Sequence, residues 1–135
     1  MPALNFQSQF APKILAGGKP FTLRAIRADG RDPKIGQPLY LFTSMRTKKC
    51  KKFAEKACRF AINIKLSYRL IEIPGFKNLT SPDQLELFSE RDGFDSYAEF
   101  SKFHEITACM TPKPMRLISW LTRDELKREL VLFEK

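Results

Sequence analysis

The spacing of hydrophobic positions predicts short strands in the first half of the chain. Leu4 and Phe6 alternate with polar residues, and residues 21–27 alternate apolar and polar side chains with a period of two, which is typical of a strand with one face in water. Residues 39–43 are β-branched and aromatic in character and predict a further strand. The apolar run over residues 57–73 predicts one or two strands, with any break near residues 66–68. A short helix is expected over residues 10–16, ended by Gly17-Gly18.

The pattern changes after Pro74-Gly75, where helical spacing replaces strand alternation. Ser81 followed by proline indicates a helix start, and this helix is expected to end near Gly93. Asp95-Ser96 is typical of the cap of a second helix. Its apolar side is formed by Tyr97, Phe100, Phe103 and His104.

The C-terminal segment predicts one more strand and then an element of either kind. Residues 115–121 predict the strand, and Thr122 with Glu125 has the form of a capping box. The tail to Phe133 is therefore a short helix or a last strand. Several strands from distant segments with helices inserted favour a small α+β barrel over a parallel α/β sheet. The 135 residues fit a single domain over residues 1–135.

The charge of the chain is strongly basic and unevenly placed. Lys and Arg number 24 against 15 Asp and Glu, a net charge of +9. Residues 1–75 hold 15 basic and 4 acidic side chains, whereas residues 76–135 hold 9 basic and 11 acidic ones. A basic half on a folded domain predicts a polyanionic partner, most often nucleic acid. The alternative is that the charge serves solubility alone.

Several classes of protein are disfavoured by the sequence. No apolar run approaches the roughly 20 residues of a membrane helix, and the N-terminus lacks the pattern of a secretory signal. Three widely spaced cysteines argue for a reducing, cytoplasmic setting. No CxxC pair occurs and His104 is the single histidine, so neither a metal nor a cofactor is expected. His104 is interpreted as a packed or hydrogen-bonded structural residue.

The densest candidate for chemistry is the segment over residues 17–24. Strand periodicity places Thr22 and Arg24 on one face, about 7 Å apart, with Lys19 at the strand entrance. A cation at the mouth, a hydroxyl and a guanidinium are suited to a small anionic or polar ligand. The alternative is a solvated strand face with three ordinary polar residues.

This segment resembles the ASCH family of small domains with a PUA-like β-barrel. The family signature is Gly-x-Lys, two residues, Ser or Thr, one residue and Arg, and it is matched by Gly17, Lys19, Thr22 and Arg24. Residues 34–39 look like the family's Gly-Asp-x-Leu segment with Gln37 in place of Asp, and residues 91–97 resemble its acidic-Gly-Phe link. The loop over residues 45–50 looks like a subgroup frequent in phage and prophage genomes. The resemblance spans roughly residues 4 to 120.

The resemblance implies a fold and two candidate activities. The implied fold is the PUA-like barrel with a short N-terminal helix and two helices before the last strands. The implied role is recognition of RNA, a nucleotide or a modified nucleoside. One small bacterial member that resembles this chain hydrolyses the acetyl amide of N4-acetylcytidine with a Lys, a Thr three residues later and a distant Glu. Lys19 and Thr22 match the first two, and the third falls on Asp92, or on Glu90 as the fallback.

The implied hydrolase chemistry is coherent but carries a tension. Threonine needs an adjacent base, and a desolvated Lys19 with a lowered pKa can serve. A carboxylate beside that lysine would raise the lysine pKa and oppose this role. Arg24 or Arg46 could stabilise an oxyanion.

A second basic cluster lies between residues 46 and 59, where seven of fourteen residues are Lys or Arg. Such a cluster can contact several phosphates, and neighbouring aromatic rings can stack on unpaired bases. The alternative is a solvated basic loop beside core aromatic residues. The predicted ligand-binding residues are Arg24, Arg46, Thr47, Lys48, Lys49, Lys51, Lys52, Tyr40 and Phe53.

Three functions therefore remain open. The first is binding of RNA, a nucleotide or a modified nucleoside in the basic pocket. The second is an amidohydrolase that deacylates N4-acetylcytidine-type nucleosides. The third is a phage-encoded adaptor that binds a host protein through its basic face. No membrane partner is expected, and the oligomeric state stays open.

Overall fold

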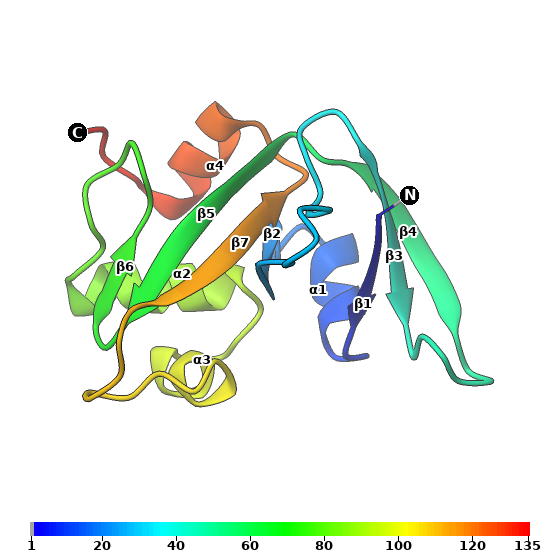
Figure 1. Cartoon of the computed structure of the whole chain (residues 1–135), viewed down its shortest axis with the longest axis horizontal. Coiled ribbons are helices and arrows are strands. Elements are labelled where there is room, and N and C mark those ends of the chain that lie inside the picture. The colour runs from blue at the N-terminus through cyan, green and yellow to red at the C-terminus, as the bar shows by residue number, and fades with distance from the viewer. Residues whose placement is uncertain (1) are drawn as a thin grey trace.

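The computed structural model describes residues 2–135, which form a mixed α+β fold with two sheets and four helices (Figure 1). The first sheet has the order β1-β3-β4, with bounds Ala3–Phe6, Pro38–Thr43 and Lys51–Ala57. The second has the order β2-β7-β5-β6, with bounds Phe21–Ala25, Lys113–Ser119, Phe60–Ser67 and Leu70–Glu72. The helices α1 to α4 have the bounds Phe10–Leu15, Pro82–Arg91, Tyr97–Phe103 and Arg123–Leu130.

The strand pairings keep the two sheets separate. Strand β1 pairs parallel with β3, and β3 pairs antiparallel with β4 through a register shift between Leu41 and Phe42. Strand β7 lies between β2 and β5 and is antiparallel to both. Among the described residues these pairings form two sheets, so the expected closed barrel is not shown.

Strand β4 departs from the expectation of a basic loop over residues 46–52. Lys51 and Lys52 already belong to β4, where four of the seven residues are exposed. The apolar run after it forms β5 and β6, with Arg69 at positive φ in the turn between them. The tail forms a helix: Thr122 accepts a hydrogen bond from the Glu125 N–H and caps α4, which begins at Arg123.

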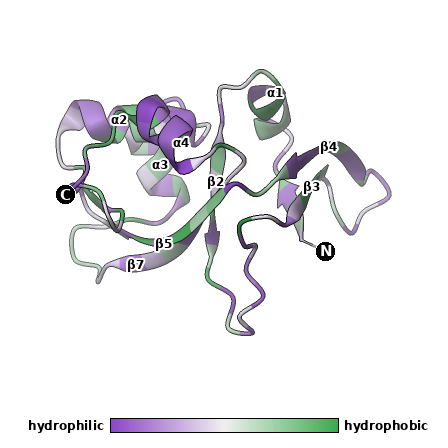
Figure 2. Ribbon diagram, turned by 90° about the horizontal axis from the view of Figure 1, so that it is seen from above, coloured by the Kyte–Doolittle hydropathy of each residue, from purple (hydrophilic) through white to green (hydrophobic). Residues whose placement is uncertain are grey.

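Two clusters of buried side chains hold the fold together. The larger cluster packs α2, α3 and α4 against the second sheet, and Figure 2 shows these helices together on one side of β5 and β7. The smaller cluster joins α1, β1 and β3 and includes Ile118 of β7. Phe94, in the link between α2 and α3, packs against both clusters. No helix among residues 2–135 is long and apolar enough to cross a membrane.

Candidate functional site

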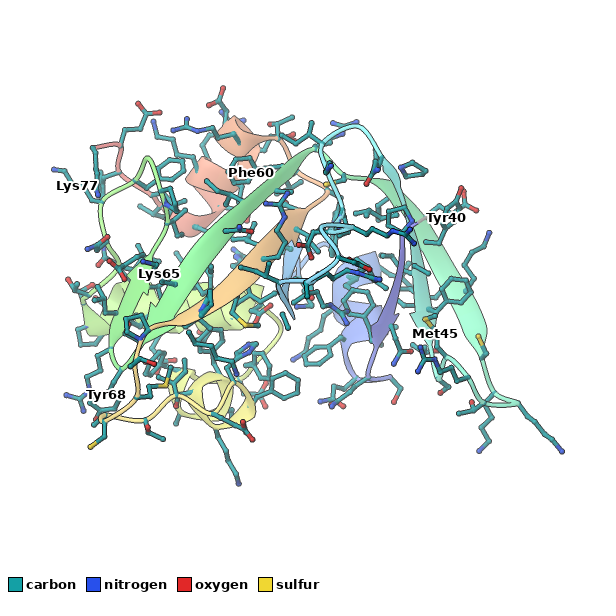
Figure 3. The ribbon with its side chains drawn as sticks, viewed as in Figure 1. Tyr40, Met45, Phe60, Lys65, Tyr68 and Lys77 are labelled. Atoms are coloured by element: carbon teal, nitrogen blue, oxygen red, sulfur yellow. The ribbon has the colours of Figure 1, made fainter. Side chains whose placement is uncertain are left out.

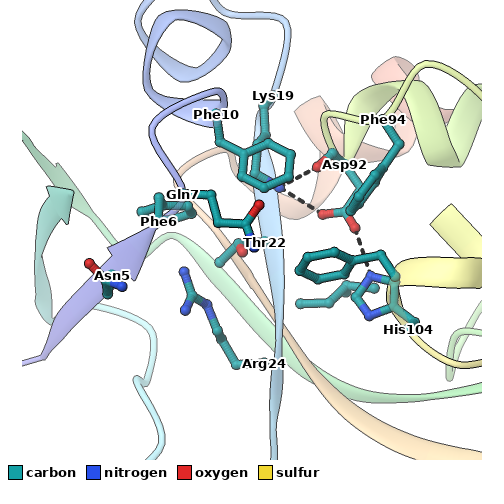
Figure 4. Close-up of a pocket in the computed structure, with 12 residues that line it drawn as sticks. Asn5, Phe6, Gln7, Phe10, Lys19, Thr22, Arg24, Asp92, Phe94 and His104 are labelled. Carbon is teal, nitrogen blue, oxygen red and sulfur yellow. Dashed lines mark hydrogen bonds and ion pairs between the residues drawn. The ribbon is translucent and has the colours of Figure 1, made fainter. Parts of the chain in front are cut away.

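A cavity of about 240 Å³ lies where β1, α1 and β2 meet the segment that links α2 and α3 (Figure 4). Its walls thus come from two distant parts of the sequence, residues 5–24 and 92–104, and from both sheets. Among the described residues it is lined by Asn5, Phe6, Gln7, Phe10, Lys19, Thr22, Leu23, Arg24, Asp92, Phe94, Phe103 and His104.

Strand β2 supplies three of the polar groups. Thr22 is buried and Arg24 is half-buried, and both line the cavity because they are two positions apart on one strand. Lys19 precedes the strand and is only 2% exposed. The expectation of a cation at the mouth is therefore wrong, because Lys19 reaches inward to a buried carboxylate.

That carboxylate is Asp92, which is also only 2% exposed. The Lys19 ammonium donates to Asp92 Oδ1 over 2.7 Å and also to the Asp92 carbonyl oxygen. Burial lowers the pKa of Lys19 below its usual 10.5, Asp92 opposes that change, and the nearby Arg24 and Lys13 add to it. Pairing with Asp92 thus favours the charged form of Lys19, whereas burial disfavours it.

The other oxygen of Asp92 meets His104. His104 Nε2 lies 3.2 Å from Asp92 Oδ2, and the His104 carbonyl accepts a hydrogen bond from Lys113 over 2.8 Å. Asp92 is therefore held between a lysine and a histidine. His104 makes the hydrogen bond expected of a structural residue, and it also lines the cavity, which the sequence did not indicate.

The backbone after Asp92 requires a glycine. Gly93 has φ +100°, and a Cβ there would lie 2.7 and 2.9 Å from two ring carbons of Phe10 and 3.0 Å from Lys19 Cδ. The Lys13 ammonium donates to the Gly93 carbonyl oxygen. This close approach lets the ring of Phe10 and the stem of Lys19 pack directly on the chain that carries Asp92.

Aromatic rings form the other walls of the cavity. The Phe10 and Phe94 ring centroids lie 5.4 Å apart, and those of Phe94 and Phe103 lie 5.0 Å apart. The Arg24 guanidinium carbon lies 4.5 Å from the centroid of Phe6. Phe103 is 49% exposed and thus reaches the rim. The cavity has a polar interior edge and apolar walls, which suits a planar ligand with polar edge atoms.

The structure brings some predicted residues together and separates others. Lys19, Thr22, Arg24 and Asp92 share the cavity, whereas the fallback Glu90 is exposed and outside it. The basic loop and strand residues Arg46, Thr47, Lys48, Lys49, Lys51 and Lys52 are exposed and do not line it either.

The two aromatic residues predicted to stack on bases lie elsewhere. Phe53 is half-buried and packs edge-on against Phe6 with centroids 6.0 Å apart, so it faces the core. Tyr40 is half-buried with the Lys52 ammonium 5.7 Å from its ring centroid, and Lys52 pairs with Glu55. The loop between β3 and β4 nevertheless adjoins the cavity. Its Met45 N–H donates a hydrogen bond over 3.0 Å to the side chain of Asn5, which lines the cavity.

The cavity residues that sequence reasoning missed are mostly aromatic. Phe6 follows the alternation of β1, and Phe103 and His104 follow helical spacing. Both patterns predict residues that face the hydrophobic core. A stripe of apolar spacing does not indicate which rings border a cavity. That information depends on how the two sheets meet.

Comparisons with known proteins bear on the fold. No family model matches the chain, and a search of curated proteins gave no significant match. A solved structure, the crystal structure of ASCH from Zymomonas mobilis, superposes with a TM-score of 0.52 and 13% sequence identity over 93% of this chain and 76% of that one. The fold is thus ASCH-like. At this identity the likeness concerns the fold alone.

The phage-type subgroup, the roles of the site residues and the single domain stay predictions. No group of three or more His, Cys, Asp or Glu side chains in residues 2–135 is arranged to hold a metal ion.

Proposed function

We propose that this protein binds RNA or a related nucleotide by holding one unpaired or modified base in the cavity beside Thr22. The observation that carries this proposal is the buried Asp92 carboxylate, fixed between Lys19 and His104 and bordered by phenylalanine rings. Buried charges that line a cavity are costly for a purely structural role. Lys19, whose pKa is lowered by burial, is the kind of group that gathers at functional sites. The ASCH-like fold and the signature residues Lys19, Thr22 and Arg24 support the same class of ligand.

The size and the chemistry of the cavity support a base as the recognised group. Its volume of about 240 Å³ is below the roughly 300–1,000 Å³ of common small-molecule sites, so it suits one ring system and leaves sugar and phosphate outside. Phe10, Phe94 and Phe103 offer stacking surfaces. Thr22 can donate and accept at the edge of the base, and Lys19 has a third N–H beyond the two that Asp92 uses.

The test is calorimetric titration with adenosine, guanosine, cytidine, uridine and N4-acetylcytidine. Thr22→Val removes a hydroxyl and keeps the shape, and Thr80→Val makes the same change at an exposed position outside the cavity. A neutral hydrogen bond contributes about 0.5–1.5 kcal/mol, so Thr22→Val should weaken the preferred nucleoside by about 2- to 12-fold and Thr80→Val should not. Equal affinities for both variants, or no nucleoside binding by the wild type, would overturn the proposal.

A second function, hydrolysis of the acetyl amide of N4-acetylcytidine, is favoured by the lowered pKa of Lys19 in the cavity that holds Thr22. In this reaction neutral Lys19 takes the Thr22 hydroxyl proton as the hydroxyl oxygen bonds to the acetyl carbon. Arg24 faces the oxyanion, and the C–N bond then breaks as the proton passes from Lys19 to the leaving amine. Water hydrolyses the acetyl-threonine, which releases acetate and restores Thr22.

The hydrolase proposal has a simple assay. Cytidine release from N4-acetylcytidine is followed for the wild type, Lys19→Ala and Thr80→Val. Turnover by the wild type and Thr80→Val that Lys19→Ala abolishes would support the proposal. Absence of turnover in the wild type, or turnover that persists in Lys19→Ala, would overturn it.

The finer classification also belongs to the proposal. We place the chain in the ASCH family of the PUA-like superfamily as one domain over residues 1–135, with the 45–50 loop of the phage-type subgroup and a cytoplasmic location. The signature spacing and the ASCH-like fold support the family. Phe94, which packs against both core clusters, supports one folding unit.

A further inference from the structure

A second, larger cavity adjoins the first on the side of the loop over residues 26–37. It has a volume of about 820 Å³ and lies between the start of β1, the end of β2, this loop and the beginning of the β3–β4 loop. Its charged lining residues in the described chain are five cations and one acid, Asp32. We call it the arginine groove, and its cations are Arg24, Arg27, Arg31, Lys34 and Arg46.

Arg24 joins the arginine groove to the base-sized cavity, because it lines both. Its guanidinium rests on Phe6, and its buried Nε–H has no hydrogen-bond partner in the described chain. A buried donor without a partner is unfavourable, and an anionic oxygen at this point would satisfy it. The junction of the two spaces therefore presents a guanidinium whose hydrogen-bonding capacity is not fully used within the described chain.

The loop that borders the arginine groove is held in shape by its own acids. Asp32 accepts from the Arg27 N–H over 3.1 Å, and Asp29 accepts from the Arg27 guanidinium over 2.8 Å and from the Arg31 N–H over 2.9 Å. The hydrogen bonds from Arg27 and Arg31 lower the pKa of Asp29 to about 2, so it stays ionised. The Arg116 guanidinium of β7 also donates to the Pro33 carbonyl over 3.1 Å.

The remaining cations of the groove are free to meet a ligand. Arg31, Lys34 and Arg46 are exposed, and none of them forms an ion pair with a described residue. The acids of the loop are occupied by the loop itself, so this surface has a surplus of unpaired positive charge. Such a surface suits a chain of phosphates.

We propose that the arginine groove binds the phosphodiester backbone of a single-stranded polynucleotide whose unpaired base occupies the cavity. This inference rests on the proposed function. The cavity holds one ring system, so the phosphates must lie outside it, and Arg24 places the nearest phosphate at the mouth of the groove. The strand is single because a base that enters the cavity leaves its pairing partner.

The test compares two double variants with the same change in charge. Arg31→Gln/Lys34→Gln removes two groove cations, and Lys77→Gln/Arg128→Gln removes two exposed cations outside both cavities. Figure 3 shows Lys77 at the end of the molecule opposite Tyr40 and Met45. The probes are the preferred nucleoside and a labelled pyrimidine oligonucleotide, as RNA and as DNA and in single-stranded and duplex form. Each is titrated over a series of salt concentrations.

The groove variant should lose salt dependence that the control keeps. Each single-strand phosphate contact contributes about 0.7 to the slope of log affinity against log salt, so the groove pair should lower the slope by about 1.4 and leave nucleoside affinity unchanged. Equal slopes for groove and control variants would overturn the inference. So would a larger loss in Lys48→Gln/Lys49→Gln, which removes two lysines outside both spaces.

The two proposals fail in different ways. If the groove inference alone is wrong, Thr22→Val still weakens nucleoside binding while the groove variant behaves like its control. If base recognition is wrong, Thr22→Val changes neither probe, whatever the groove variant does. Equal affinity for duplex and single-stranded forms of the oligonucleotide would also overturn the groove inference, and the RNA and DNA arms identify the backbone that is bound.

Discussion

The base-sized cavity and the arginine groove share Arg24 and use charge in opposite ways. In the cavity, Lys19 and Asp92 are buried and paired with each other, and His104 completes the set. In the groove, the cations are mostly exposed, and the acids of the loop serve to shape the loop. Charges in the cavity are therefore part of the folded core, whereas loss of the exposed groove cations Arg31, Lys34 and Arg46 should not disturb it.

This difference suggests separate roles: the cavity would select the ligand, and the groove would attract it. Buried partners fix the positions of a few donors and acceptors, which selects a ligand by shape and hydrogen bonding. Exposed cations act at longer range and are screened by salt. Substitutions in the cavity should therefore change stability strongly, and matched substitutions in the groove should change it little.

The largest contrast is expected between Asp92→Ala and Asp29→Ala. Loss of one member of a buried ion pair typically costs about 3–5 kcal/mol of unfolding free energy, because the remaining charge is left uncompensated. Asp29 belongs to an exposed pair with Arg27, so its loss should have a much smaller effect. Urea denaturation of both variants measures the contrast.

A paired substitution checks the cause. Lys19→Met/Asp92→Leu removes both buried charges, and it should recover part of the stability that Asp92→Ala loses. If Asp92→Ala and Asp29→Ala proved equally mild, the cavity charges would not belong to the core in the sense argued above.

The next contrast in stability is between Gly93→Ala and Gly30→Ala. Gly93 lies beside the cavity, and Gly30 lines the arginine groove. Both have positive φ, so both share a backbone cost of about 1–2 kcal/mol. Only at Gly93 does the added Cβ clash, with Phe10 ring carbons 2.7 and 2.9 Å away, which adds about 1–3 kcal/mol. Thermal or chemical unfolding should therefore place Gly93→Ala below Gly30→Ala, and equal values would refute the close packing at Asp92.

The smallest effect is a pH dependence that belongs to the cavity. Burial lowers the pKa of Lys19 in the folded state below 10.5, so between that lowered pKa and 10.5 the unfolded chain binds more protons. Stability from this group therefore rises with pH through that window and is lowest where folded Lys19 is charged. The free energy of unfolding of the wild type relative to Lys19→Met should increase from neutral pH toward 10.5, and a flat or falling difference would contradict the sign.

The part of the cavity made by β2 could be predicted from local sequence. A period of two placed Thr22 and Arg24 on one face, and the Gly-x-Lys segment placed Lys19 before them. Asp92 is 73 positions from Lys19, and only the resemblance to a family suggested it. No local pattern can join residues so far apart, because their meeting depends on the packing of α2 beside β2.

The arginine groove was hidden for a related reason. The Gly, Pro and Asp content of residues 28–37 predicts turns. Composition does not fix the path of a turn, and that path decides where its cations point. The start of β4 was not predicted as strand, because its exposed lysines Lys51 and Lys52 are typical of a loop. The sequence drew attention instead to the exposed lysines near residue 48, which lie outside both spaces.

The lysine contacts around Asp92 also bear on folding kinetics. Lys13 and Lys19 reach the carbonyl groups of Gly93 and Asp92 across 80 and 73 positions of the chain. We expect contacts of such separation to form late in folding, because the entropy of loop closure opposes them. A bound base would therefore stabilise contacts that the folding transition state lacks. It would lengthen the lifetime of the native state by slowing unfolding and leave the folding rate almost unchanged.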